Sequence, residues 1–302
     1  MAKIRSNHVD KKKSSSGGTI ARVGILGAIM AGLFYLFQSF LGGDGSAPAD
    51  GPAVDDYAGE DYYLPAPSGG TLVRHRSYAL SYNEDWEQAE WVAYILTREE
   101  LQRPWNERVD NFRPDPTVRS GSASPDDYRG SGYDRGHLLP AADRAFDAEL
   151  ADETFYMSNI TPQARQFNQG IWRELEELTR DWAKRNGRLY VVTGPVLTQA
   201  AKGTIGANKI PIPAAYYKVL LDLDEPETKA IAFLLPNQVS FAPLYDYVVS
   251  VDDVEAATGI DFFPELMPPD LETRLEARSN IDLWPFSKKK FDRRINDWNN
   301  VN

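Results

Sequence analysis

The chain has 302 residues and a formal net charge of −11, from 33 Lys and Arg against 44 Asp and Glu, and 42% of its residues are hydrophobic. These values are typical of a globular protein with one large or two small domains. The lack of cysteine excludes disulfides, thiolate nucleophiles, iron–sulfur clusters and Cys-ligated zinc. Histidine occurs only as His8, His75 and His137, which excludes zinc sites of the HExxH type.

The N-terminal region combines a basic tail with a long apolar run. Residues 1–22 contain six basic residues against one acidic residue, and Val23–Leu41 is free of charge over 19 residues. A helix of that length spans ~28 Å, close to the thickness of the hydrocarbon core of a bilayer. We therefore expect a basic cytoplasmic tail over 1–22, a single transmembrane anchor over 23–41 and a flexible acidic Gly/Pro linker over 42–70.

The charges on either side of the apolar run predict its orientation. Basic residues precede it and acidic residues follow it, which places the bulk of the chain on the periplasmic or extracellular side of the membrane. Secretion is the alternative, because Ala47-Pro48-Ala49 resembles a signal-peptidase site and cleavage after Ala49 would release the rest of the chain.

From Thr71 to the C-terminus we expect one α+β domain, 71–302. Segments rich in Val, Ile, Leu and aromatic residues predict six strands, at Leu72–Arg76, Tyr78–Tyr82, Trp91–Leu96, Leu189–Thr193, Tyr216–Leu223 and Ala230–Leu235. Apolar residues at helical spacing predict an amphipathic helix over Gly170–Arg185, and Ser250–Thr258 with Gly259 behind it predicts a capped helix. Residues 103–135 hold many turn formers and predict a long structured loop region.

The sequence around His137 indicates phosphate chemistry. Tyr133–His137 reads Y-D-R-G-H, so the histidine adjoins an arginine, an aspartate and a glycine that permits close backbone approach. A lone histidine is more often a packing residue, but this one lies in a region rich in arginine and free of lysine. The arginines are Arg108, Arg113, Arg119, Arg129, Arg135, Arg144, Arg165 and Arg173. Arginine is the side chain that binds phosphate through two parallel hydrogen bonds.

Two further motifs follow in order. Ser158–Gln163 reads S-N-I-T-P-Q, and Asn168–Glu176 reads N-Q-G-I-W-R-E-L-E. With D-R-G-H, this series resembles the DNA/RNA non-specific endonuclease family, which includes secreted bacterial nucleases and mitochondrial endonuclease G. The resemblance runs from about Val73 to the C-terminal region and includes D-V-E-A-A-T-G at Asp253–Gly259. It implies an α+β, ββα-metal nuclease fold with a mixed or antiparallel sheet core.

The resemblance implies the central roles at the site. His137 would be the general base that activates water, Asn168 the direct protein ligand of one Mg²⁺, for which Mn²⁺ could substitute, and Glu176 the residue that holds the waters around the ion. On an ideal helix, positions 168 and 176 are ~80° apart around the axis and ~12 Å apart along it. Both can face one ion if Asn168 lies at or before the helix start, or if Glu176 acts through waters.

The remaining implied roles concern the phosphate and the partners. Asn159 and Arg108 would contact the phosphate or support the site, and Asp134 and Arg135 would orient neighbours or contact phosphate. DNA and RNA are the implied substrates and a homodimer is a possible assembly. A mitochondrial location ranks second, because Val23–Leu41 is not an amphipathic, Arg- and Ser-rich transit peptide.

The chemistry of hydrolysis supports this residue set independently. A neutral imidazole suits proton abstraction, since its ordinary pKa of ~6.5 is close to working pH. Mg²⁺ prefers oxygen ligands and keeps several waters, so one asparagine carbonyl can anchor it. Two other functions stay open: a membrane-anchored protein that binds nucleic acid for uptake without cutting it, and a phosphodiesterase of another substrate.

Charge is the main objection to a nucleic-acid substrate. Because the tail contributes +5 to the total of −11, the rest of the chain carries −16 and should repel a polyanion at long range. We expect the arginine-rich segments to form a local positive groove. Residues 288–294, with three lysines and two arginines, add a basic patch that could bind phosphate, although a solvated tail is favoured.

The charge pattern yields a test of membrane topology. Protease added to intact cells or spheroplasts should digest the domain and spare the basic tail, because Val23–Leu41 would leave the tail inside. Immunoblots with antibodies against each part give the readout, and lysed cells serve as the control. Complete protection of the domain behind a sealed membrane would contradict this topology. A soluble product that begins near Asp50 would instead establish cleavage after Ala49.

Overall fold

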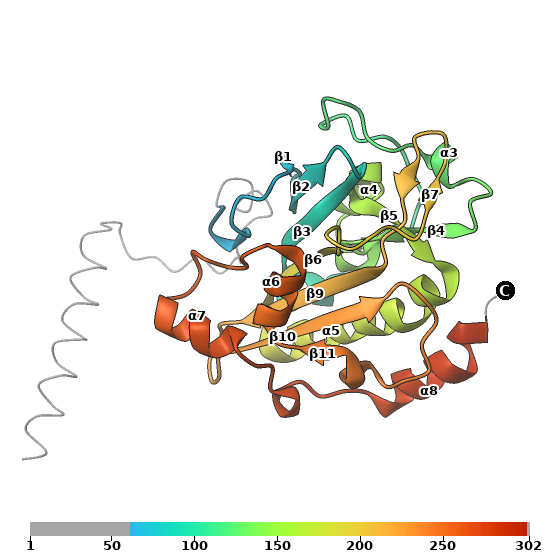
Figure 1. Cartoon of the computed structure of the whole chain (residues 1–302). Helices are drawn as coiled ribbons and strands as arrows, with labels where there is room; N and C mark the ends of the chain where they lie inside the picture. The colour runs from blue at the N-terminus through green and yellow to red at the C-terminus, as the bar shows by residue number, and fades with distance from the viewer. Residues whose placement is uncertain (1–60, 301–302) are drawn as a thin grey trace, which may run out of the picture. The chain divides into compact units, whose positions relative to one another are not determined.

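The computed structural model describes residues 61–300 (Figure 1). The basic tail, the expected membrane segment Val23–Leu41 and most of the expected linker lie outside the described residues. Within 61–300, none of the helices combines the length and the apolar character that a bilayer crossing requires.

A seven-stranded antiparallel sheet forms the centre of the domain (Figure 1). In spatial order its strands are β1 (Thr71–Arg74), β2 (Ala79–Asn83), β3 (Gln88–Thr97), β6 (Arg188–Pro195), β9 (Ala215–Asp222), β10 (Lys229–Pro236) and β11 (Val248–Val249). The six strands expected from composition are confirmed within a few residues at their ends, and β11 is an addition. The mixed α+β class is likewise confirmed.

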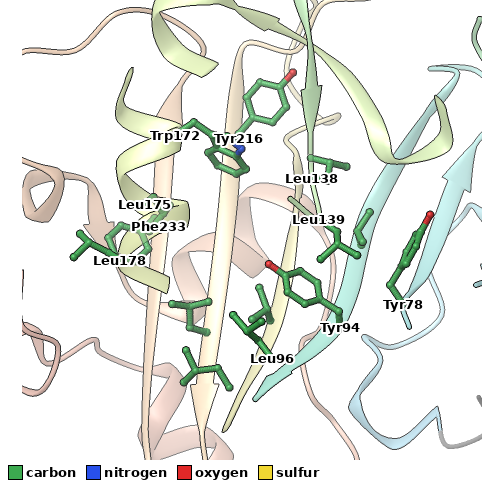
Figure 2. Packing of buried hydrophobic residues seen from close by; sticks show 14 of the residues in the cluster. Tyr78, Tyr94, Leu96, Leu138, Leu139, Trp172, Leu175, Leu178, Tyr216 and Phe233 are labelled. Carbon is green, nitrogen blue, oxygen red and sulfur yellow. The ribbon is translucent and has the colours of Figure 1, made fainter. Parts of the chain in front are cut away.

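Both faces of the sheet are buried, which explains the continuous apolar runs in its central strands. In β9 all eight residues are buried, and they alternate between the two faces. Tyr216 and Leu220 belong to the first core with Leu175, Leu178 and Trp182 of α5 (Arg173–Asn186), part of which Figure 2 shows.

The opposite face of the sheet has its own core. Tyr217, Val219 and Leu221 of β9 pack there with Val251 and Val254 of α6 (Val251–Thr258). The helix α7 (Pro269–Glu276) contributes partly buried leucines to the same side. The predicted cap of α6 is confirmed: the Ser250 hydroxyl accepts from the Asp253 main-chain N–H, and Gly259 ends the helix with a φ of 74°.

A separate antiparallel pair lies outside the large sheet. It joins β4 (Tyr133–His137) to β5 (Ile160–Ala164), and α5 follows next along the chain after one wide helical turn. The expected loop at 103–135 therefore ends in a strand. The smaller elements are α2 (Arg98–Gln102), α3 (Pro125–Tyr128), α4 (Ala148–Glu153), α8 (Lys288–Asn296) and the pair β7 (Thr204–Ile205) and β8 (Ile210–Pro211).

The folded domain includes residues 61–70, which were expected to belong to the linker. Tyr63 and Leu64 are buried in the second core, and the Ala66 main-chain N–H donates to the Asp261 carbonyl at 2.9 Å. The burial of Tyr63 and Leu64 helps to hold this segment on the domain, since each buried apolar side chain contributes about 1.5–3 kcal/mol of hydrophobic free energy.

The basic C-terminal segment is a helix rather than a solvated tail. Arg294 of α8 is fully buried and donates to the Glu174 carboxylate of α5 and to the carbonyls of Ser240 and Ala242, each at 2.6 Å. Arg144, one of the arginines expected to bind phosphate, is also buried, with its guanidinium donating to Ser77 and Ile95. Both cations serve the fold because main-chain oxygens satisfy their donors.

Candidate active site

The strand β4 presents the D-R-G-H motif in a fixed register against β5. Gly136 lies opposite Thr161 and His137 opposite Ile160. A Cβ on Gly136 would lie 2.2 Å from the side chain of the buried Gln163. The glycine is therefore required by the close approach of the Gln163 side chain, and this approach sets the position of the neighbouring histidine.

His137 is held in a hydrophobic setting. It is 8% exposed, and its ring packs against Phe112 and Phe155 at centroid distances of 5.5 and 5.0 Å. Burial, together with the nearby charge of Arg108, lowers the pKa of His137 to about 3. The imidazole is thus neutral throughout the physiological range. Its Nε2 is buried and has no hydrogen-bond partner among the described residues.

The chain after His137 is fixed by Asn159. This side chain is fully buried: its Oδ1 accepts from the Leu139 N–H at 2.9 Å, and its Nδ2 donates to the carbonyls of Leu139 and Thr154. The Trp172 indole donates to the His137 carbonyl at 3.2 Å. Of the two roles that the resemblance allowed for Asn159, the contacts correspond to support of the site.

Asn168 lies in the wide turn Phe167–Trp172, which precedes α5. The backbone leaves helical geometry at Gly170, with φ −103° and ψ −107°, so the spacing of an ideal helix does not apply between positions 168 and 176. Asn168 and Glu176 consequently line one cavity. A Cβ on Gly170 would lie 2.6 Å from Oδ1 of Asn299, so the turn depends on close contact with the C-terminal segment.

Asp134 connects β4 to this wide turn. Its Oδ2 accepts hydrogen bonds from Asn168 Nδ2 at 3.0 Å and from Gln169 Nε2 at 3.1 Å, and Arg165 lies 3.9 Å from its Oδ1. Asp134 therefore orients the side-chain amides of Asn168 and Gln169. Gln169 received no role from the sequence, although its position beside Asn168 in the N-Q-G motif was a usable indication.

Two adjoining cavities share Arg108, Asn168 and Gln169 in their walls. The first has a volume of about 560 Å³ and is also lined by Arg129, Arg135 and Arg165, against the carboxylates of Asp110 and Asp134. The second, of about 640 Å³, is lined by Arg173, Glu176, Glu177, Arg180, Asp181, Lys184 and Lys290, among others. Cationic side chains outnumber carboxylates in both, so the expected local positive groove is present.

Arg108 and Arg135 are positioned by aromatic rings. The Arg135 guanidinium lies 4.2 Å from the centroid of Phe112, and that of Arg108 lies 5.2 Å from the centroid of Phe155. These are the two rings that enclose His137. Arg108 also pairs with Asp110 at 2.5 Å, with both side chains more than half exposed. Each guanidinium is thereby kept beside the histidine while remaining accessible to an anion.

A buried polar cluster lies around Glu176. Asp143 is paired with Arg180 at 2.7 Å and accepts a hydrogen bond from Tyr94, and Lys218 lies 5.1 Å from the centroid of the Trp172 ring. Burial raises the pKa of Glu176 and lowers that of Lys218, while the attraction between the two charges opposes both shifts. The sequence analysis missed this cluster, but a lysine within the apolar strand A-Y-Y-K-V-L-L-D was an indication.

A model of the DNA/RNA non-specific endonuclease family matches residues 59–268. The chain belongs to this family. A nuclease of Nostoc sp. is 36% identical over 236 residues, which are 70% of this chain and 83% of the Nostoc protein. Human mitochondrial endonuclease G is 32% identical over 214 residues, 67% of this chain and 72% of the human protein.

The fold of this family member agrees with that of a solved structure. It matches EndoG in the crystal structure of the EndoG/EndoGI complex with a TM-score of 0.63 and 29% identity, over 72% of this chain and 95% of that chain. The chain is accordingly a nuclease, a hydrolase of phosphodiester bonds, in a family that generally depends on divalent metal ions. The family match ends at Pro268, so α7 and α8 lie beyond it.

The lowered pKa of His137 predicts how acid affects the stability of the nuclease. Below pH 6.5 the unfolded chain binds a proton at His137 that the folded chain, with a pKa of about 3, does not bind. The free energy of unfolding is unaffected by this group above pH 6.5 and falls as the pH decreases from 6.5 towards 3. At ~1.4 kcal/mol per pH unit, the loss is about 1–2 kcal/mol between pH 7 and pH 5.

The variant His137→Gln removes the titrating group, so its free energy of unfolding should fall by about 1–2 kcal/mol less over this pH interval. Urea unfolding of both proteins at pH 7, 6 and 5 measures the difference. All other titrating groups are common to the two proteins and cancel. Parallel pH profiles would show that the folded protein leaves the His137 pKa near its ordinary value.

Proposed function

We propose that the protein is a Mg²⁺-dependent endonuclease that cleaves both DNA and RNA, with His137 as the general base and Asn168 as the direct metal ligand. The observation that carries this proposal is the composition of one site. A buried neutral imidazole packs against Phe112, which lines an arginine-rich cavity together with Asn168, and Glu176 lines the adjoining cavity.

The proposed substrate range follows from what the first cavity can recognise. Its cationic side chains are all arginines, and they suit the phosphate groups that DNA and RNA share. Contacts to phosphate fix the position of a nucleic acid but carry no sequence information. A site built on such contacts accepts either sugar and any base sequence.

The donor set fits Mg²⁺. The Nδ2 of Asn168 donates to Asp134, and no described residue donates a hydrogen bond to its Oδ1, so a neutral oxygen is left for a cation. Glu176 lines the same cavity and would hold the waters that Mg²⁺ retains. When bound, Mg²⁺ neutralises charge on the phosphate and assists departure of the 3′ oxygen.

The protein residues supply the rest of the mechanism. Neutral His137 accepts the proton of the attacking water, and Trp172 and Asn159 fix the backbone that carries the ring. Arg108 and Arg135 bind the phosphate beside it and stabilise the charge that develops during attack. Asp134 holds the Asn168 amide in the orientation that metal binding needs.

We further propose that the nuclease domain lies outside the cytoplasm, anchored by the apolar segment Val23–Leu41. The support is the charge asymmetry on the two sides of that segment. In that location the substrates would be nucleic acids that reach the cell from outside.

His137→Ala should lower the cleavage rate of plasmid DNA and of RNA by ~10²–10⁴-fold, because the proton acceptor is lost. The purified full-length chain is assayed with Mg²⁺ and with EDTA, and fluorescence polarisation measures DNA binding, which should be retained. His75→Gln serves as control: His75 pairs with Asp115 and packs on Tyr78 and Tyr156 rather than on the rings beside Arg108 and Arg135, so the rate should change by a few-fold at most.

Two results would overturn the assignment. Cleavage by His137→Ala within a few-fold of the unmodified protein would exclude His137 as the base. An unmodified protein that binds DNA and RNA tightly but cleaves neither with Mg²⁺ would favour the uptake alternative. Cleavage of small phosphodiesters alone would point to a different substrate.

Asn168→Ala should remove most activity, and excess Mg²⁺ should restore it only in part. Added Mg²⁺ raises occupancy by mass action, but a displaced catalytic group can cost ~10²-fold in rate. The measurement is cleavage rate against Mg²⁺ concentration. Gln169→Ala is the matched control, since Gln169 is the next residue and donates to the same Asp134 oxygen. Its half-saturating Mg²⁺ concentration should stay within about threefold of the unmodified value. An unshifted Mg²⁺ curve for Asn168→Ala would mean that the metal is held elsewhere.

A further inference from the structure

Three carboxylates meet on the face of the sheet opposite α5. Asp252 and Glu255 belong to α6, and Glu276 is the last residue of α7. One ligand oxygen from each lies within 4.8 Å of the others. The two helices are in contact and cover the second core, whereas α5, with Glu176, covers the first (Figure 1). The cluster is therefore separate from the catalytic cavities.

Glu276 is the unusual member of this cluster. The residue is 6% exposed, and its Oε1 is buried without a hydrogen-bond partner among the described residues. A buried carboxylate without a partner is costly, because neither water nor protein replaces its hydration. The neighbouring carboxylates of Asp252 and Glu255 increase the cost, because each brings an oxygen within 4.8 Å of one from Glu276.

No protein cation within residues 61–300 compensates these charges. The ion pairs of this part of the chain include none with Asp252, Glu255 or Glu276. The Phe262 main-chain N–H donates to Oε1 of Glu255 at 3.0 Å, which orients that carboxylate. Asp252 is exposed, so the cluster is open to solvent on one side and closed at Glu276.

The spacing suits one hard divalent ion. Three carboxylates that bring one oxygen each within 4.8 Å of the others can converge on one ion through small side-chain rotations, and Ca²⁺ accepts six to eight oxygen ligands in flexible geometry, with carboxylates and waters mixed. Mg²⁺ needs shorter bonds and near-ideal octahedral geometry, which three carboxylates on two separate helices match less well. Asp252 at the rim would leave room for waters to complete the shell.

We propose that Asp252, Glu255 and Glu276 form a second, structural divalent-cation site, suited to Ca²⁺, that fastens α7 to α6. Glu276 lies beyond residue 268, where the family match ends. The ion would satisfy the unpartnered Glu276 oxygen and cancel part of the repulsion among the carboxylates. It would stabilise the fold without taking part in phosphodiester cleavage.

The test measures Ca²⁺ binding and thermal unfolding rather than catalysis. The full-length chain carrying Asn168→Ala, which weakens the proposed catalytic metal site, is titrated with Ca²⁺ by isothermal calorimetry. One binding event per chain is expected. At ~100-fold excess over the dissociation constant, the unfolding midpoint should rise by ~3–10 °C.

Three further variants in the same background locate the ion. Asp252→Asn and Glu276→Gln should each weaken Ca²⁺ binding by at least about tenfold and abolish most of the rise in midpoint. Asp252 is exposed, so its variant should fold normally even if Glu276→Gln does not. Asp270→Asn, an exposed position at the start of α7 with the same change of charge, is the matched control and should bind Ca²⁺ like the parent.

The proposal is wrong if Ca²⁺ leaves the midpoint of the Asn168→Ala chain unchanged, or if the rise in midpoint survives in both Asp252→Asn and Glu276→Gln. A nuclease assay with Mg²⁺ distinguishes failure of the Ca²⁺ proposal from failure of the proposed function. Asp252→Asn in the otherwise unmodified chain should cleave at the normal rate below its unfolding temperature. Loss of nuclease function would therefore leave this test intact, and loss of Ca²⁺ binding would leave the nuclease assignment intact.

Discussion

The hydrogen bond from the Trp172 indole to the main-chain oxygen of His137 joins the hydrophobic core to β4, the strand that carries the D-R-G-H motif. Trp172 is fully buried and packs against Phe167 and Tyr216, so the sheet fixes its orientation. The indole has a single donor, and burial makes the loss of its partner costly. The same residue ends the wide turn that carries Asn168. Trp172 thus helps to set the positions of both His137 and Asn168 relative to the sheet.

The large sheet could be predicted from the sequence because each of its strands is marked by a local run of apolar residues. Strands that are buried on both faces read as continuous apolar runs, and Ala215–Asp222 is the clearest example. The pair β4 and β5 could not be predicted in this way, because Asp134 and Arg135 are polar and Pro162 interrupts the second strand. Cross-strand hydrogen bonds hold this pair together with a small apolar cluster that includes Tyr133 and Ile160.

The candidate site was predictable in part. The resemblance supplied the residue types, but spacing could not place Asn168 and Glu176 at one cavity, because the turn between them depends on the approach of Gly170 to the distant Asn299. Counting the arginines in the sequence also overestimated how many of them line the positive groove. Arg144 follows an aspartate in the sequence, as Arg135 does. Its guanidinium nevertheless donates to the carbonyls of Ser77 and Ile95, which are distant in the sequence, so a local pattern cannot reveal these partners.

The hydrophobic setting of His137 has a consequence for when the protein is reactive. In the free protein, burial and the nearby positive charges make the ring a poor proton acceptor. A phosphate bound between Arg108 and Arg135 brings negative charge to the same place, and an opposite charge nearby raises the pKa of an imidazole. Under the proposed mechanism, a bound polyanion therefore raises the basicity of the histidine that accepts the proton. The basicity of His137 therefore depends on whether phosphate is bound. Without bound phosphate the imidazole stays a weak base, and an uncharged ester at the same place would not raise its pKa.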